Sequence, residues 1–120
     1  MSVHLDTERD AGCVATVSGD ADLYAAANVE RELVRLVDEG HGSIVVDLTE
    51  ATFIDSTMLR VLVNVSKRLR PGGGELLVVC HEHNIRKIFE ITLLDRVFTI
   101  FESRDAALAF LAAGEAGREV

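Results

Sequence analysis

The chain has 120 residues, 48% of them hydrophobic, and carries 20 Asp and Glu against 12 Lys and Arg. That length fits a single domain with a substantial core, and that hydrophobic content excludes a disordered chain. The net charge of −8 repels phosphate backbones and anionic lipid, so direct binding to nucleic acid or to a membrane surface is disfavoured. No apolar run approaches the ~18 residues of a membrane span, and no basic segment leading into a hydrophobic run opens the chain, so we expect a soluble cytoplasmic protein.

The first third of the chain predicts a β-hairpin followed by a helix. Residues 3–8 (VHLDTE) and 13–19 (CVATVSG) alternate apolar and polar side chains, as strands with one solvent-facing side do. Apolar residues then recur at helical spacing up to Val37, and Asp20 or Asp22 can cap the start of that helix.

Buried strands are expected in the remaining chain. Three short runs rich in β-branched and apolar residues predict them, namely SIVVDL (43–48), ELLVVC (75–80) and VFTIF (97–101).

Helices separate these strands. One is expected to run to about Arg70, where PGGG (71–74) interrupts it. A short helix can be capped by Asn84, and a last helix can be capped by Ser103 and run through Leu111.

The predicted order of elements is β-β-α-β-α-β-α-β-α. It indicates an α/β fold with a mixed, mostly parallel sheet of about five strands, about four helices and an antiparallel hairpin at its start. We expect one domain over residues 1–113 and a flexible tail over residues 114–120. Cys13 and Cys80, each among strand-forming residues, are expected to be free buried thiols.

Each candidate for chemistry has a simpler explanation. In CHEHN (80–84), His81 and His83 could lie on one side of an extended segment and bind a metal, but no second cluster completes the four ligands of a structural zinc site. PGGG lacks the Lys-Ser/Thr of a phosphate loop and precedes a strand. Ser56 has no Gly-x-Ser-x-Gly elbow around it. We therefore expect no enzyme, no catalytic residues, no metal and no cofactor.

The motif Asp55-Ser56-Thr57 stands where a segment leaving a strand meets the next helix, and two explanations are open. Asp, Ser or Thr at a helix start accepts hydrogen bonds from free N–H groups, worth roughly 1 kcal/mol per cap. Alternatively, the serine is a phosphorylation site. The positive end of a helix favours an anion by about 0.3–1 kcal/mol, and a phosphoserine adds about −1.5 to −2 charges. Beside Asp55, that charge would disrupt a partner interface and leave the fold intact, which are the properties of an on–off switch.

The helix after this motif is more apolar than packing on a sheet requires. Leu59 and Val63 widen its apolar arc to about 200°. Apolar surface left over near Ser56 would mark a partner site, and fuller coverage by neighbouring helices is the rival explanation. The stripe that can face the sheet comprises Met58, Val61, Leu62, Val65 and Leu69.

Four segments carry a likeness to a known family: SGDADLYAA (18–26), IVVDLTEATFIDSTMLRVLV (44–63), GGELLVVC (73–80) and IRKIFEITLLDRVFTIFES (85–103). With these segments, the sequence resembles the STAS domains of the anti-sigma factor antagonist (anti-anti-sigma, SpoIIAA-like) group. The Asp-Ser-Thr motif after a Val-Val-Asp-Leu strand is its most specific feature, and together with the order of elements the resemblance runs through nearly the whole chain.

The resemblance implies a small bacterial signalling protein that sequesters an anti-sigma factor with serine kinase activity and so frees a sigma factor for transcription. The kinase would use ATP to phosphorylate the serine directly after the motif's Asp, and a serine phosphatase would restore it. By this match Ser56 is the phosphorylation site, with Thr57 as the second candidate, while Asp22 and Asp55 tune the switch.

We expect a contact face around the motif, and periodicity leaves open which of the apolar residues there face the sheet and which face the partner. The family commonly has Gly where Met58 stands, and a Met side chain fills space that Gly leaves open to a partner backbone. That departure bears on partner identity and on access of the kinase to Ser56. The expected partner-binding residues are Asp22, Ser56, Thr57, Met58, Leu59, Arg60, Leu62 and Val63.

Two other functions stay open at this point. One is a STAS subunit of a transporter, lipid-trafficking or stress-signalling complex that works without phosphorylation. The other is a ligand-binding or enzymatic domain that uses CHEHN with a metal. Neither nucleic acid nor a membrane is expected as a partner, and the chain is expected to be a monomer or a weak dimer.

Overall fold

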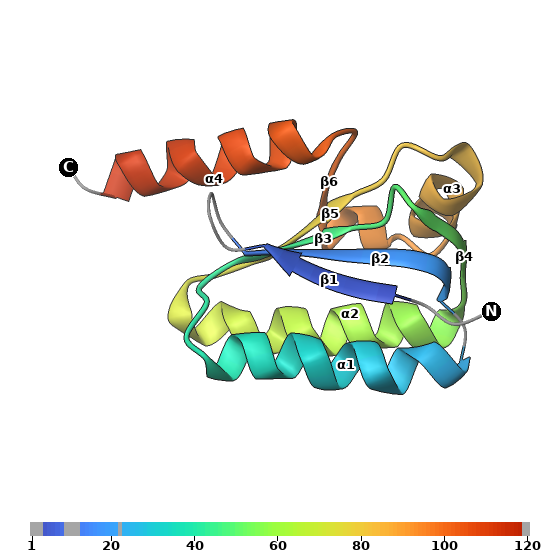
Figure 1. Cartoon of the computed structure of the whole chain (residues 1–120). Coiled ribbons are helices and arrows are strands. Elements are labelled where there is room, and N and C mark those ends of the chain that lie inside the picture. The colour runs from blue at the N-terminus through green and yellow to red at the C-terminus, as the bar shows by residue number, and fades with distance from the viewer. Residues whose placement is uncertain (1–3, 9–12, 22, 119–120) are drawn as a thin grey trace.

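The computed structural model describes residues 4–8, 13–21 and 23–118, which form one sheet with helices on both faces (Figure 1). The strands of these residues are β1 (His4–Glu8), β2 (Cys13–Ala21), β3 (Ile44–Asp47), β4 (Ala51–Ile54), β5 (Leu76–Val79) and β6 (Thr99–Phe101). Their helices are α1 (Leu23–Asp38), α2 (Ser56–Leu69), α3 (His83–Ile91) and α4 (Arg104–Arg118), with the short 3₁₀ turns η1 (Arg70–Gly72) and η2 (Leu94–Arg96).

The sheet has the strand order β1-β2-β3-β5-β6, and β4 pairs separately with β2. β1 and β2 form an antiparallel hairpin, whereas β2, β3, β5 and β6 are parallel to one another. The predicted α/β fold with a mostly parallel sheet is therefore confirmed. The sequence pattern did not separate β4, which we expected to be chain leading out of β3.

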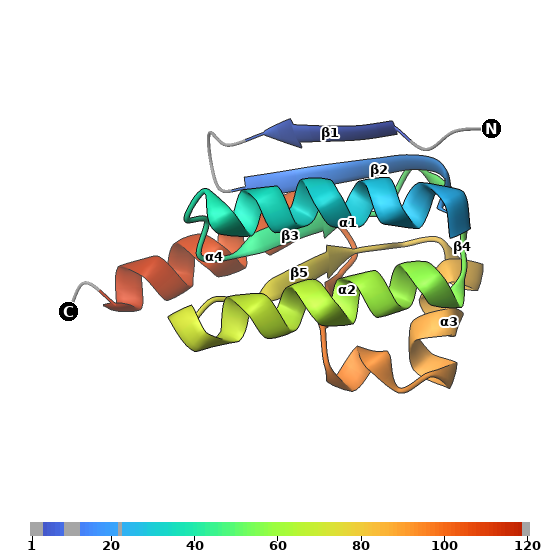
Figure 2. The same ribbon diagram turned by 90° about the horizontal axis from the view of Figure 1, so that it is seen from below.

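One face of the sheet carries most of the hydrophobic core. α1 and α2 run side by side across this face, and α3 packs at its end (Figure 2). Leu33 of α1, Leu62 of α2 and Phe89 of α3 are fully buried here. We call this cluster the major core. Its size follows from the apolar stripes of three helices meeting the same side of four strands.

The opposite face is covered by α4 (Figure 1). Its cluster, the minor core, consists of Val14, Val45, Leu77, Val79 and Ala107, with Phe101, Leu108 and Leu111 packed against them. Because both faces are covered, the central strands are apolar on both sides, as their continuous β-branched runs indicate. None of the helices described here is long and apolar enough to cross a membrane.

A polar network ties the start of α4 to the sheet. Asp47, at the end of β3, is only 3% exposed. Its Oδ2 accepts hydrogen bonds from Nε and Nη2 of Arg104 at 3.1 and 3.0 Å, and its Oδ1 accepts one from the backbone N–H of Thr49 at 2.9 Å. Nη2 of Arg104 also donates to the hydroxyl of Thr16 at 2.7 Å. A buried carboxylate is stable only when it is hydrogen-bonded or paired with a cation, and this network provides both.

Two local predictions were wrong. We expected Asn84 to cap α3, but the helix begins at His83, and Glu82 caps it by accepting the N–H of Ile85 at 2.9 Å. We also expected the last helix to run through Leu111, whereas α4 continues to Arg118. Both errors concern helix ends, where several neighbouring residues can supply the same cap.

The predicted cap of the last helix agrees with the structure. The hydroxyl of Ser103 accepts the N–H of Ala106 at 3.1 Å. Of the two expected caps for α1, Asp22 lies outside the described residues, and only the backbone of Asp20 is described.

Candidate functional site

The turn from β4 into α2 answers which residue of Asp55-Ser56-Thr57 caps the helix. Asp55 has extended backbone angles, and its Oδ1 accepts the N–H of Met58 at 3.1 Å. The backbone C=O of Asp55 accepts the N–H of Leu59 at 3.2 Å, which is the first hydrogen bond of the helix. Asp55 is therefore the N-cap, and capping does not require the hydroxyl of Ser56.

Ser56 is the first residue of α2 and is exposed to solvent. Within the described residues, no hydrogen bond involves its hydroxyl group. The N–H groups of the first helical turn have no carbonyl partner inside the helix, and the helix dipole makes this end positive. A phosphoryl group on Ser56 would thus stand at the end of α2 that favours an anion, without displacing a buried contact.

The neighbouring hydroxyl has a different environment. Thr57 is half-buried, whereas Ser56 is exposed. Arg60, one turn further along α2, is exposed as well. Ser56 is accordingly the more accessible of the two candidate phosphate acceptors.

The register of the sheet brings together the ends of the two strands that precede Asp22 and Asp55 in the chain. β2 and β4 are parallel, and Ala21 of β2 pairs with Ile54 of β4. Asp22 and Asp55 are the residues that follow this pair along the chain. Asp22 itself lies outside the described residues, so its tuning role stays a prediction that the pairing of Ala21 with Ile54 supports.

Three residues expected on the contact face belong to the interior. Met58 and Leu62 are fully buried and Leu59 is 5% exposed, all within the major core. The structure therefore removes Met58, Leu59 and Leu62 from the contact face, because α1 and the sheet cover the wide apolar arc of α2. Val63 is half-buried and packs against the same core.

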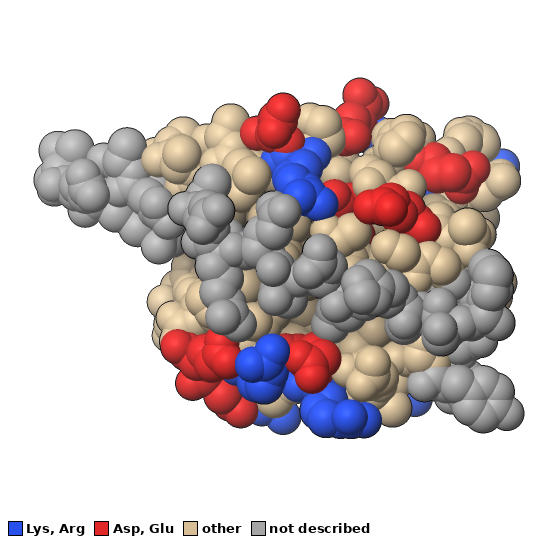
Figure 3. Space-filling view, in the orientation of Figure 1, with Lys and Arg blue, Asp and Glu red and all other residues tan. Residues whose placement is uncertain are grey.

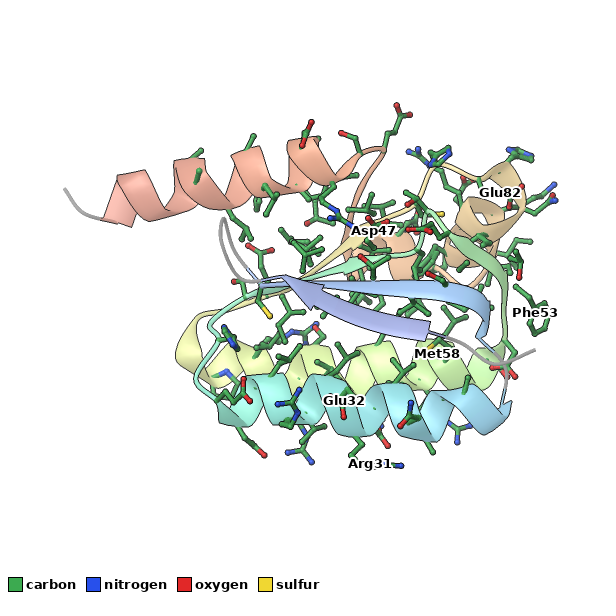
Figure 4. The ribbon with its side chains drawn as sticks, in the orientation of Figure 1. Arg31, Glu32, Asp47, Phe53, Met58 and Glu82 are labelled. Atoms are coloured by element: carbon green, nitrogen blue, oxygen red, sulfur yellow. The ribbon has the colours of Figure 1, made fainter. Side chains whose placement is uncertain are left out.

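The burial of Met58 shows where the side chain lies that replaces the glycine common in the family pattern. Its side chain points into the core beneath the sheet rather than toward solvent (Figure 4). The methionine therefore fills interior volume and does not occupy the space in front of Ser56. The expected obstruction of a partner backbone is not found.

An exposed aromatic residue near Ser56 was missed by the sequence analysis. Phe53 of β4 is 48% exposed and lies on the outer side of that strand (Figure 4). It escaped notice because β4 does not alternate: Thr52 and Phe53 are both exposed between buried Ala51 and Ile54. The pairing of β2 with β4 shifts register between Gly19 and Asp20, which accounts for a locally irregular strand.

The histidine-rich segment does not assemble a metal site within the part of the chain that the structure describes. No group of three or more His, Cys, Asp or Glu residues lies close enough there to hold an ion. His81 and His83 are exposed, and Glu82 between them is engaged as the cap of α3. The Cys80 thiol is buried 3.7 Å from the carbonyl oxygen of Glu82, and burial raises its pKa, which favours the unreactive protonated form.

The glycines of PGGG have a structural role. Gly73 has a φ of 80° and ends the turn η1. A side chain at Gly74 would collide with the backbone carbonyl of Gly42 in the neighbouring connection. This segment is a turn, as predicted, and it also brings two loops close together.

The outer surface of α1 is a solvated face. Acidic and basic side chains alternate along the lower edge of the molecule in Figure 3. On α1, Arg35 bridges Glu32 at 2.9 Å and Glu39 at 2.8 Å. Exposed pairs of this kind stabilise a helix weakly and do not form a site.

Comparison with known proteins identifies the fold family. The family model described as the STAS domain matches residues 4–107. The chain belongs to the STAS domain family.

Relatives of this STAS domain include several proteins named for one activity. A Bordetella bronchiseptica protein with the provisional name anti-sigma factor antagonist BtrV is 35% identical over 100 residues, covering 83% of this chain and 86% of its own. The crystal structure of an anti-sigma factor antagonist from Mycobacterium paratuberculosis is 27% identical, covers 89% of this chain and 92% of its own, and has a TM-score of 0.82. Bacillus SpoIIAA in its phosphorylated form has a TM-score of 0.69 over 91% of this chain and 98% of its own; at 15% identity that likeness concerns the fold alone.

Proposed function

We propose that this STAS domain is an anti-sigma factor antagonist, a binding module of the bacterial cytoplasm switched by phosphorylation of Ser56. Unphosphorylated, it sequesters an anti-sigma factor with serine kinase activity and so frees a sigma factor for transcription. The names of its relatives in Bordetella and Mycobacterium support this partner class. The observation that carries the switch is the exposed hydroxyl of Ser56 beside an Asp55 that already caps α2.

The proposed modification is a phosphoryl transfer from ATP. The Oγ atom of Ser56 forms a bond to the γ-phosphorus, the bond from that phosphorus to ADP breaks, and the hydroxyl proton passes to a base of the kinase. Hydrolysis of the phosphoserine by a serine phosphatase restores the hydroxyl. In this scheme the STAS domain supplies the acceptor and the docking surface, and the catalytic groups belong to the kinase and the phosphatase.

The charge of the phosphoryl group explains why binding would be lost and the fold kept. It adds about −1.5 to −2 charges next to the carboxylate of Asp55. The helix end and the solvent around Ser56 accept this charge in the free protein. A partner surface that fits the neutral serine would face an unpaired charge, and mispaired charge across an interface costs several kcal/mol, of which each 1.4 is tenfold in affinity.

The contact face that fits the structure is smaller than the one expected from the sequence. It retains Ser56, Thr57, Arg60 and the half-buried Val63, and it gains exposed Phe53 on β4. Asp55 borders the serine, and Asp22 and Asp55 are kept as the proposed tuning residues.

The acceptor residue can be tested by intact-mass measurement. The chain is incubated with ATP and each serine-kinase anti-sigma factor of the same cell. We expect a gain of one phosphoryl group that is absent in Ser56→Ala and present in Thr57→Ala. Binding without any phosphoryl gain would contradict the switch and indicate a STAS module that works without phosphorylation.

The effect on affinity needs a matched control for charge. We expect Ser56→Asp to weaken binding of the anti-sigma factor at least about tenfold, while Asn64→Asp, exposed two turns along α2, changes it less than about twofold. Melting temperatures of both variants should stay close to that of the unmodified chain. Equal affinities for the Ser56→Asp variant and the unmodified chain would overturn the switch.

A further inference from the structure

Within the described residues, the sheet ends in a strand with a free edge. β6 is the last strand in the order and pairs with β5 on one side. The C=O of Phe101 accepts the N–H of Cys80 at 2.9 Å, so the backbone groups of Phe101 point toward β5. Because successive residues of a strand point their backbone groups to opposite sides, the N–H and C=O of Ile100 point away from the sheet. An edge of this kind is a template for pairing with another strand.

A groove of about 390 Å³ lies along this strand, between α3, η2 and β6. Val97 and Ile100 contribute apolar surface to it. Three residues at the end of α3 and in its connection to β6 are large, hydrophobic and exposed: Ile91 (71%), Leu93 (55%) and Val97 (42%). Of these three, Val97 lines the groove itself, so the free edge stands beside apolar surface that pairing could cover.

The charges of the groove are balanced, in contrast with the chain as a whole. Two arginines and two acidic residues line it: Arg86, Arg96, Glu90 and Asp95. The net charge of the chain is −8, so two copies repel each other over most approaches. At this groove each copy has both positive and negative side chains, and a two-fold arrangement lets the cations of one copy face the acids of the other.

We propose that the β6 edge and its groove bind the same surface of a second copy, which makes a two-fold dimer with a continuous sheet. β6 of one copy would pair antiparallel with β6 of the other about Ile100. In that register the N–H of each Ile100 donates to the C=O of the Ile100 in the other copy, so the outward-pointing backbone groups of both residues are hydrogen-bonded. A strand of three residues gives a small contact, and contacts below the usual interface size are weak, so the dimer forms only at high protein concentration.

Sedimentation equilibrium of the full chain over a wide concentration range tests this proposal. We expect a monomer–dimer equilibrium in which Arg96→Glu raises the dissociation constant at least about tenfold by giving the groove excess negative charge. The matched control is Arg68→Glu, an exposed residue in the last turn of α2 that changes the total charge by the same amount. It should change the constant less than about twofold.

Amide hydrogen exchange locates the contact. The N–H of Ile100 should exchange more slowly as the chain concentration rises. Val97→Lys places a charge in the groove beside the edge strand and should abolish that change. Circular dichroism and the melting temperature verify that both groove variants fold. A chain that stays monomeric, a dimer weakened equally by Arg96→Glu and Arg68→Glu, or an Ile100 amide protected only by a different protein would each overturn the proposal.

Discussion

The two faces of the sheet are closed in different ways. Three helices cover the major core, and their apolar stripes interlock over most of the face. One helix, α4, covers the minor core, which has five buried residues. The minor face has a compensating polar tie, because Arg104 reaches from the first turn of α4 to the buried carboxylate of Asp47. The difference indicates that the major face sets the stability of the domain, while α4 is held by a local network and can open separately.

The candidate site takes its rigidity from the major face. Ser56 begins α2, and Met58 and Leu59 in the same first turn are buried in the major core. The serine is thus an exposed group on a firmly packed helix. A charge added there is expected to act on a partner surface rather than on the fold.

The largest effect is expected in the major core. Phe89 is fully buried and meets Phe98 edge to face at 6.1 Å between ring centres. Phe89→Ala should lower the free energy of unfolding by about 4 kcal/mol, since it removes a large side chain from a face that cannot collapse around the cavity. Leu77→Ala, equally buried beneath α4, should cost about 2 kcal/mol because a single helix can settle into the space. Urea denaturation measures both, and equal costs would contradict the proposed difference between the faces.

The next effect concerns the tie of α4. Arg104→Met leaves the carboxylate of Asp47 buried without its cation, and breaking a buried pair costs about 3–5 kcal/mol. We expect about 2 kcal/mol here, because the side chain of Arg104 is 32% exposed and solvent screens the pair. The control is Arg86→Met, whose exposed pair with Glu102 at 3.2 Å should contribute less than about 0.5 kcal/mol. Similar losses of unfolding free energy in the two variants would show that the network with Asp47 stabilises α4 no more than an exposed ion pair does.

A smaller effect is expected from removing the helix caps, and it distinguishes α2 on the major face from α4 on the minor face. Asp55→Ala and Ser103→Ala each remove one capping hydrogen bond, worth roughly 1 kcal/mol. The loss at Asp55 should lower the stability of the whole domain, since α2 belongs to the major core. The loss at Ser103 should appear mainly as faster amide exchange within α4, with a smaller change in the global unfolding midpoint. Amide exchange measured residue by residue distinguishes the two, and uniform acceleration in both variants would mean that α4 does not open by itself.

Much of the fold could be predicted from hydrophobic periodicity alone. The continuous apolar runs that became β3 and β5 predicted strands buried on both sides, and α4 covers the second side. The tie between Asp47 and Arg104 could not be predicted, because the two residues are 57 positions apart and neither has a local signal. β4 was missed since its two exposed residues break the alternation that identifies a strand.

The candidate site shows a similar limit. The motif was located correctly, but composition could not decide which of three neighbouring side chains caps α2, because Asp, Ser and Thr can all accept the same N–H. The apolar arc of α2 gave its width but not what covers it. Met58, Leu59 and Leu62 were therefore candidates for the contact face, although Met58 and Leu62 also belonged to the stripe that can face the sheet, and the structure buries all three. Periodicity describes one helix at a time, and burial is decided by its neighbours.

The smallest expected effect is a gain in stability on replacing a strained residue next to the major core. Leu93, in the connection from α3 to η2, has a φ of 61°, a left-handed conformation that costs a residue with a Cβ atom about 1–2 kcal/mol. Leu93→Gly removes that strain but loosens the unfolded chain by about 0.5–1 kcal/mol, and the exposed side chain contributes little burial. The net result should be a gain of about 0.5 kcal/mol in the free energy of unfolding. Leu94→Gly is the control, because Leu94 packs against the major core with no such strain and should lose stability. A lower free energy of unfolding in both variants would mean that the exposed side chain of Leu93 stabilises the domain by more than its backbone strain costs. Contacts outside the major core would then hold the connection from α3 to η2 in its strained conformation.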